Sequence, residues 1–154
     1  MAQLHKPLKH PSEFQPGEEF TPVEFVVSRG LVDYYLVGIN DRHPWYTEAS
    51  PFDGPVVPPV LAHTYSGISR AYYIFREFCP LHIEPASVHY SYDAEYVDPI
   101  KVGEKITVKG KCVAAYERRG RKFSDTEYNV YGEDGRLCIH LLESHTWFAK
   151  EEGK

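Results

Sequence analysis

The pattern of apolar and polar positions separates a helical first half of the chain from a strand-like second half. After Pro85, four β-prone runs follow one another, separated by short turn segments. The turns at 119–120 and 132–135 contain glycine, as β-hairpin turns commonly do. The second half is therefore predicted to be an antiparallel sheet. Its predicted strands are Ser87–Val97, Lys105–Tyr116, Lys122–Tyr131 and Arg136–Phe148.

Alternation of small or apolar residues with polar ones is clearest in the second of these runs. Side chains two residues apart point to the same side of a strand, so one face of this strand is predicted to be buried. The residues predicted on that face are Ile106, Val108, Gly110, Cys112 and Ala114.

The first half begins with a predicted short strand over Phe20–Val27. Ser28 is a suitable N-cap for a helix over Arg29–Ile39. A longer helix is predicted over Val60–Phe78, because prolines suit the first turn of a helix and apolar residues then recur at helical spacing. Its predicted apolar face contains Val60, Leu61, Tyr65, Ile68, Ala71, Tyr72 and Phe75.

A loop over residues 41–59 joins the two predicted helices and contains five prolines. Proline fixes φ, so the loop is expected to be stiff. A loop of this length in a small domain is more often functional than idle. Asp41, His43, Trp45 and Tyr46 lie in it, and His63 follows on the long helix. Any chemistry is expected here.

Length and composition exclude several classes of protein. The chain has 154 residues and is 42% hydrophobic, which suits one compact domain. Its net charge of −5 gives no electrostatic case for nucleic-acid binding. No apolar run reaches a membrane-spanning length, and the three cysteines lack a C-x-x-C spacing, which favours reduced thiols in a cytoplasmic protein. The histidines lack metal-ligand spacing, so no metal is predicted.

Two segments of the chain carry a family resemblance, namely Gly38–Tyr46 with 54–59, and Tyr96–Ile106. They resemble the MaoC-like hydratase/dehydratase family, and specifically its N-terminal, FAS1-like dehydratase type. The resemblance covers residues 20–148 and implies an α+β chain with a single hotdog fold, in which an antiparallel sheet wraps round one long central helix. Residues 1–19 are then an N-terminal arm, predicted to pack loosely, and 149–154 a charged tail.

The first segment departs from the motif of the catalytic members, which is Asp-x-Asn-Pro-x-His followed by a His-Gly pair at the start of the helix. Asp41 and Pro44 match the motif. His43 replaces its Asn, Tyr46 replaces the catalytic His, and 58–59 is Pro-Pro. This pattern is closer to the N-terminal, often non-catalytic units of the family, which pair with a catalytic partner.

The resemblance implies hydration or dehydration of an acyl thioester, which needs an acid, a base and donors for the enolate oxygen. Such donors are expected at the N-terminus of the long helix. Pro58 and Pro59 have no N–H, so the donor falls to Val60 or Leu61. The candidate catalytic residues are Asp41, His43 and Tyr46, and the candidate substrate-binding residues are Val60, Leu61, His63, Ser66 and Trp45.

Each of these residues also has a purely structural interpretation. Asp41 is equally suited to bonding backbone amides in its own loop. His43 suits a surface position, and Trp45 and Tyr46 suit packing. His63 also suits an interior position bonded to backbone. These alternatives stay open on the sequence alone.

The resemblance leaves three functions open. The first is a hydratase or dehydratase that acts as a homodimer with sites between two hotdog units. The second is a non-catalytic subunit that binds the acyl group or stabilises another hotdog subunit. The third is a thioesterase in which Asp41 or Glu77 activates water. In each case coenzyme A or a carrier protein belongs to the substrate and no cofactor is expected. The basic turn over 118–122 suits the phosphates of such a carrier or plain solvent.

Overall fold

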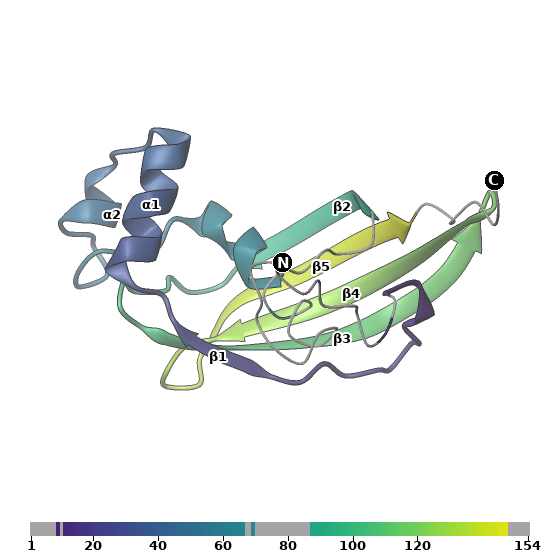
Figure 1. Cartoon of the computed structure of the whole chain (residues 1–154). Coiled ribbons are helices and arrows are strands. Elements are labelled where there is room, and N and C mark those ends of the chain that lie inside the picture. The colour runs from purple at the N-terminus through teal and green to yellow at the C-terminus, as the bar shows by residue number, and fades with distance from the viewer. Residues whose placement is uncertain (1–8, 10, 67–68, 70–86, 148–154) are drawn as a thin grey trace, which may run out of the picture.

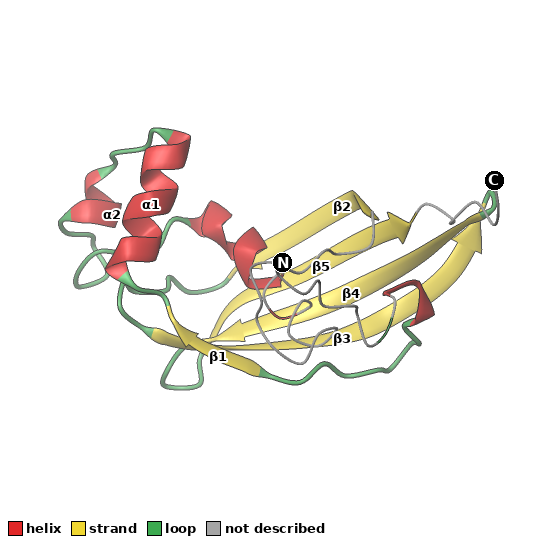
Figure 2. Cartoon of the chain, viewed as in Figure 1, coloured by secondary structure: helices red, strands yellow, loops and turns green. Residues whose placement is uncertain are grey.

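Five antiparallel strands form one curved sheet in the computed structural model, which describes residues 9, 11–66, 69 and 87–147 (Figure 1). Their order across the sheet is β1-β3-β4-β5-β2. The strands are β1 (Val23–Val26), β2 (Ser87–Tyr96), β3 (Lys105–Arg118), β4 (Arg121–Tyr131) and β5 (Leu137–Trp147). The helices α1 (Arg29–Ile39) and α2 (Pro44–Thr47) lie together at one end of the sheet (Figure 2). Two 3₁₀ turns are η1 (Pro11–Glu13) and η2 (Pro59–Leu61).

Most predicted elements agree with the structure to within two residues. Helix α1 has the predicted bounds, and Ser28 caps it by accepting a hydrogen bond from the Leu31 N–H at 3.3 Å. Strand β1 is shorter than predicted and begins after Pro22, which has no N–H for a ladder bond. Helix α2 was not predicted. It forms inside the loop because Pro44 occupies its first turn, where the missing N–H costs little.

The predicted long helix is described only at its start. It begins with η2, and residues 62–66 and 69 are helical, whereas the rest of the prediction to Phe78 lies outside the described residues. Leu61 and Tyr65 are buried as predicted. Val60 is 56% exposed, so its predicted place on the apolar face is wrong. It lies in the 3₁₀ turn, where side chains do not follow the α-helical spacing.

A bulge in β3 limits the predicted buried face of that strand. Ile106, Val108 and Cys112 are buried as predicted. The register shifts between Cys112 and Ala114, so Cys112 pairs with Thr126 and Ala114 with Asp125. Neighbouring residues of β4 point to opposite faces of the sheet. Ala114 therefore leaves the face that the alternation predicts for it.

The described part of the N-terminal arm is packed against the sheet, contrary to the predicted loose packing. Phe14 is buried in the core beside the Phe20 ring, with 5.1 Å between ring centroids. The Gly17 N–H donates to the Cys112 carbonyl at 2.8 Å, and the Cys112 N–H donates to the Glu18 carbonyl at 2.8 Å. The arm thus continues the pairing of β1 along β3.

Two further sequence predictions concern covalent and membrane features. Cys112 and Cys138 are both free and buried, and Cys79 lies outside the described residues. Across the described stretches of the chain, the helices are all too short or too polar to span a bilayer.

Candidate functional site

The turn between α1 and α2 is organised by Asp41 and His43. The Asp41 carboxylate accepts a hydrogen bond from the His43 N–H at 2.9 Å. His43 is the N-cap of α2, and its Nδ1 accepts from the Trp45 N–H at 3.3 Å. When neutral, this imidazole therefore carries its proton on Nε2. Asp41 thus bonds a backbone amide of its own loop, as its structural interpretation anticipates, and His43 caps α2 from an exposed position.

Tyr46 faces the protein interior from α2. Its side chain packs against the core, and its carbonyl accepts a hydrogen bond from Arg29 Nη1 at 2.7 Å. Burial raises the pKa of Tyr46, and the negative charge of Asp41 raises it further. The phenol is therefore protonated at neutral pH, where it acts as a hydrogen-bond donor and not as a base.

The two segments that carry the family resemblance are bonded to each other. The Val57 N–H donates to the Ile100 carbonyl at 2.8 Å, and the Val102 N–H donates to the Pro55 carbonyl at 3.0 Å. The Val56 N–H donates to the Trp45 carbonyl at 2.8 Å, which links α2 to residues 55–57. Residues 55–57 therefore join the α2 turn to the segment that follows β2.

A cavity of about 400 Å³ lies where these segments meet the sheet. Most of the lining residues are apolar or aromatic, and Tyr46, Tyr65 and Tyr96 among them carry hydroxyl groups. Tyr65 is fully buried, and its hydroxyl has no hydrogen-bond partner in the described part of the chain. The cavity is lined by Trp45, Tyr46, Phe52, Val56, Val57, Pro59, Tyr65, Tyr96, Val97, Asp98, Pro99, Ile100 and Ile139.

Asp41 lines a different cavity from Tyr46. The Asp41 cavity lies between the end of α1 and the α2 turn, with Leu36, Val37 and Thr47 among its lining residues. Trp45 and Tyr46 line the larger apolar cavity. The structure thus separates the two candidate catalytic residues by the α2 turn itself.

The start of the long helix offers fewer free donors than its sequence suggests. The Leu61 N–H is bonded to the Pro58 carbonyl at 3.0 Å, and the Leu61 side chain is buried. Since Pro58 and Pro59 have no N–H, Val60 keeps the role of candidate donor. Pro59, one residue before it, lines the apolar cavity.

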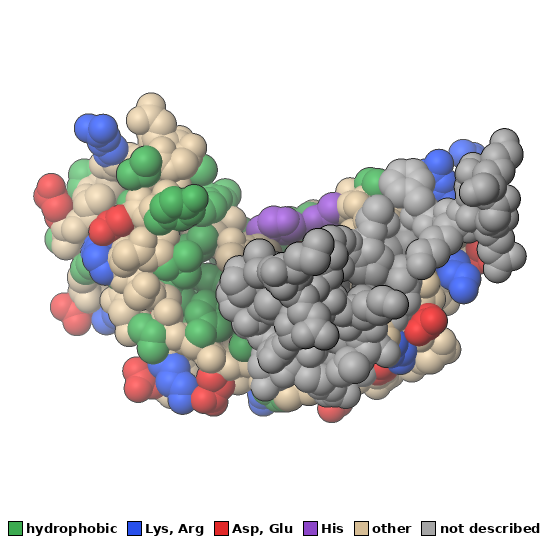
Figure 3. Space-filling model, in the orientation of Figure 1, with side chains coloured by type: hydrophobic (Ala, Val, Ile, Leu, Met, Phe, Trp, Pro, Cys, Tyr) green, Lys and Arg blue, Asp and Glu red, His purple; other side chains and the backbone are tan. Residues whose placement is uncertain are grey.

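His63 and Ser66, predicted to line the substrate cavity, contact Glu143 of β5. Ser66 Oγ donates to Glu143 Oε1 at 2.5 Å, and His63 Nδ1 lies 3.6 Å from the same oxygen. The Glu143 side chain is 1% exposed, whereas that of His63 is 61% exposed. Figure 3 shows histidine side chains gathered in a hollow beside the helical end of the molecule.

A bulge in β2 brings further residues to this cluster. The register with β5 shifts between His89 and Ser91, so that His89 pairs with His145 and Tyr92 with Glu143. The His89 ring then stacks between those of His63 and His145, at centroid distances of 4.8 and 4.3 Å.

Comparisons with known proteins place these features in a family. Residues 14–140 match the model of the FAS1-like dehydratase domain region. The chain belongs to this FAS1-like dehydratase family. No curated protein matches its sequence.

Solved structures confirm that the fold of this FAS1-like dehydratase chain is the α+β hotdog fold of the MaoC-like proteins. An (R)-hydratase from A. caviae involved in PHA biosynthesis is 15% identical, with a TM-score of 0.69 over 88% of this chain and 98% of its own. The HadBC 3R-hydroxyacyl-ACP dehydratase complex of Mycobacterium tuberculosis is 17% identical, with a TM-score of 0.72 over 85% and 96%. A monoamine oxidase regulatory protein from Archaeoglobus fulgius is 14% identical, with a TM-score of 0.75 over 94% and 97%.

Several residues at the sites of this FAS1-like dehydratase chain could not be singled out from the sequence. Tyr65 was assigned only to an apolar face, yet it lines the cavity and carries a buried hydroxyl without a partner in the described chain. Tyr96 belongs to the second family segment but carries no motif signal of its own. His89 and Glu143 are 54 positions apart in the sequence numbering, and only the pairing of β2 with β5 makes them neighbours.

Proposed function

We propose that this chain is the acyl-binding subunit of a hydratase/dehydratase for acyl thioesters, and that it works paired with a second hotdog unit. The observation that carries this proposal is the apolar cavity of about 400 Å³ between the two family segments. Its volume lies in the range of small-molecule sites, and its lining suits an acyl chain.

The few polar groups of the cavity suit the thioester end of such a ligand. The Tyr65 hydroxyl is buried without a partner in the described chain, which costs free energy until a ligand accepts its hydrogen bond. Burial raises the pKa of Tyr65, and the neighbouring Cys138 raises it further. Tyr65 therefore remains a donor, and a thioester carbonyl is an acceptor of the kind it lacks.

The catalytic base is assigned to the second unit. Asp41 opens onto a different cavity from the acyl site and accepts the His43 N–H, while Tyr46 stands where the catalytic members of the family have His. Tyr46 is protonated at neutral pH because burial and Asp41 raise its pKa. An acid and base pair at this cavity is therefore expected from a partner with the intact motif.

Exposed apolar side chains supply a surface for that partner. Strand β2 is an edge strand whose side chains are mostly exposed, and long apolar edges favour pairing with another chain. Helix α1 adds Tyr34 and Val37, which are 83% and 81% exposed. The described residues of β2 and the adjoining loop with large exposed apolar side chains are Val88, Tyr90, Tyr92, Tyr96 and Val97.

Turnover measured with and without a partner tests whether the second hotdog unit supplies the catalytic base. The purified chain, mixed with crotonyl-CoA or longer enoyl-CoAs, is expected to leave the enoyl absorbance unchanged. Addition of a hotdog protein with the intact Asp-x-Asn-Pro-x-His motif from the same genome is expected to start its decay. Rapid decay with the chain alone would show that it is itself the hydratase, and release of free thiol would identify a thioesterase.

Acyl binding is tested separately from turnover. Val57→Phe fills the cavity and is expected to weaken the binding of a long-chain acyl-CoA at least tenfold in calorimetry. Val26→Phe is the matched control, because Val26 is exposed on β1 and does not line the cavity. Equal affinity of the two variants would remove the cavity from the proposal, and coenzyme A without an acyl group controls for binding of the carrier alone.

A further inference from the structure

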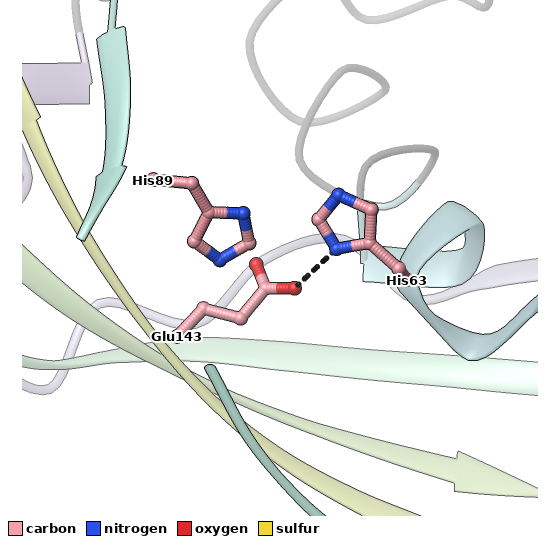
Figure 4. A group of neighbouring side chains, drawn as sticks. All are labelled: His63, His89 and Glu143. Atoms are coloured by element: carbon pink, nitrogen blue, oxygen red, sulfur yellow. Dashed lines mark ion pairs between the residues drawn. The ribbon is translucent and has the colours of Figure 1, made fainter. Parts of the chain in front are cut away.

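Three side chains from three separate elements converge on one point in the structure. His63 comes from the helix after η2, His89 from β2 and Glu143 from β5. One nitrogen from each imidazole and one oxygen of the carboxylate lie within 4.8 Å of one another. Figure 4 shows the Glu143 carboxylate reaching between the two rings.

The Glu143 carboxylate is buried with little to balance its charge. Its side chain is 1% exposed, and its bonded or ion-paired partners within the described chain are the Ser66 hydroxyl and the His63 imidazole. A buried carboxylate is costly unless it is paired or coordinates a metal. Ser66 donates a hydrogen bond to one carboxylate oxygen, and a cation bound beside the carboxylate would compensate its charge.

We propose that His63, His89 and Glu143 bind a divalent transition-metal ion, and that Zn²⁺ fits this donor set best. Two imidazoles and one carboxylate are a ligand set that Zn²⁺ takes at catalytic sites, whereas Mg²⁺ and Ca²⁺ favour oxygen donors alone. A sequence motif for such a site is absent because the three ligands come from distant segments. This site does not depend on the proposed acyl-binding function.

To bind one metal ion, the imidazole nitrogens must move slightly closer to the Glu143 carboxylate, which is held in place. Ligand atoms on one tetrahedral Zn²⁺ lie about 3.4 Å apart, so the longest separation must shorten by about 1.4 Å. The His63 side chain is 61% exposed and can rotate towards the other two ligands, while Ser66 holds Glu143 in place. His145 stacks on the far side of His89 and steadies that ring. Three protein ligands leave a fourth position for water or an external ligand.

Calorimetric titration of the EDTA-treated, dialysed protein with ZnCl₂ tests the site. One Zn²⁺ per chain is expected to bind with a Kd in the micromolar range or tighter, and MgCl₂ is expected to give no heat of binding. His63→Gln and His89→Gln should each weaken Zn²⁺ binding at least tenfold. His43→Gln and His140→Gln are matched controls, because His43 caps α2 and His140 contacts Asn129. Both controls are expected to bind as the wild type does.

Two further measurements separate a built site from adventitious binding. Co²⁺ in the same site should give the strong visible absorption of four-coordinate cobalt, which His89→Gln should abolish. Glu143→Gln is expected to weaken Zn²⁺ binding as well, with circular dichroism to confirm folding, and the exposed histidine variants decide the matter if it does not fold. A Kd in the millimolar range, or equal loss in the His43 and His140 controls, would overturn the proposal.

Discussion

Arg136 and Glu104 form a two-bond salt bridge that fixes one wall of the apolar cavity. Arg136 Nη1 donates to Glu104 Oε1 at 2.6 Å, and Nη2 donates to Oε2 at 2.9 Å. The same guanidinium donates to the Pro99 carbonyl at 3.0 Å and pairs with Asp98 at 2.8 Å. Asp98 and Pro99 line the cavity, so this pair ties the cavity wall to the β4–β5 turn.

Glu104→Gln is expected to lower the free energy of unfolding by about 2–3 kcal/mol at pH 7, because it removes one charge of a mostly buried pair. Burial alone would raise the pKa of Glu104. Hydrogen bonds from Arg136 and from the Lys101 and Glu133 amides outweigh burial and hold the pKa below its ordinary value. The stabilisation is therefore complete above the ordinary pKa and is lost as pH falls through the lower folded value.

Urea unfolding of the wild type and Glu104→Gln at pH 7 and below pH 4 measures this effect. The difference in stability should be large at pH 7 and should narrow at the acid pH. Glu133→Gln is the control, since Glu133 is exposed and its backbone N–H makes the contact. A Glu104→Gln protein as stable as the wild type at pH 7 would contradict this account.

Gly110 is a second position where a small change should be costly. A Cβ there would lie 2.7 Å from the Tyr128 ring and 2.9 Å from the Phe20 ring. Both rings are buried, so neither can move freely aside. Gly110→Ala is therefore expected to destabilise the protein by about 1–3 kcal/mol, seen as a lower Tm.

At Gly30 the same substitution is expected to have the opposite effect on stability. Gly30 lies in the first turn of α1, and a Cβ there meets nothing within 4 Å. Alanine favours a helix over glycine by about 0.5–1 kcal/mol, so this variant should be slightly more stable than the wild type. If Gly110→Ala also raised the Tm, the expected clash between a Cβ at position 110 and the Tyr128 ring would be refuted.

Strand and helix positions could be predicted from the sequence because each has a local signal. The alternation in β3 and the Ser28 cap of α1 depend on residues that are neighbours in the chain. The bulge after Cys112 has no such signal, since its effect on Ala114 appears only in the register with β4. The packing of Phe14 escaped prediction for the same reason, because Phe14 meets its partners through tertiary contacts.

In the candidate site too, features with a local sequence signal could be predicted, and features set by tertiary contacts could not. The motif identified the α2 turn, and the hydrogen bond from the His43 N–H to Asp41 fits the structural interpretation of a loop aspartate. The motif could not show that Asp41 and Tyr46 line different cavities, which depends on the direction of side chains along one short turn. Glu143 lies outside both family segments and is brought to His63 by the sheet.

Tyr34→Lys with Val37→Lys is expected to weaken the pairing of the chain with another hotdog unit or with itself. Both side chains are more than 80% exposed on α1, so the double variant should fold with nearly unchanged stability. Two lysines introduced into an apolar interface must be desolvated, which disfavours association. Sedimentation velocity should show a shift towards monomer, with Glu133→Lys as a charge-matched control on the turn between β4 and β5.

Asp41→Asn distinguishes a role of Asp41 as catalytic base from a role as acceptor of the His43 backbone hydrogen bond. Asparagine keeps a carbonyl oxygen that can accept the His43 N–H, so the α2 turn and the stability should be retained. If the base comes from the partner, activity of the assembled pair should fall less than tenfold, and acyl-CoA binding should be unchanged. Progress curves of enoyl absorbance with a fixed amount of partner measure this directly. A loss of 100-fold or more in kcat, with unchanged acyl-CoA affinity, would instead assign the base to Asp41 and make this chain catalytic.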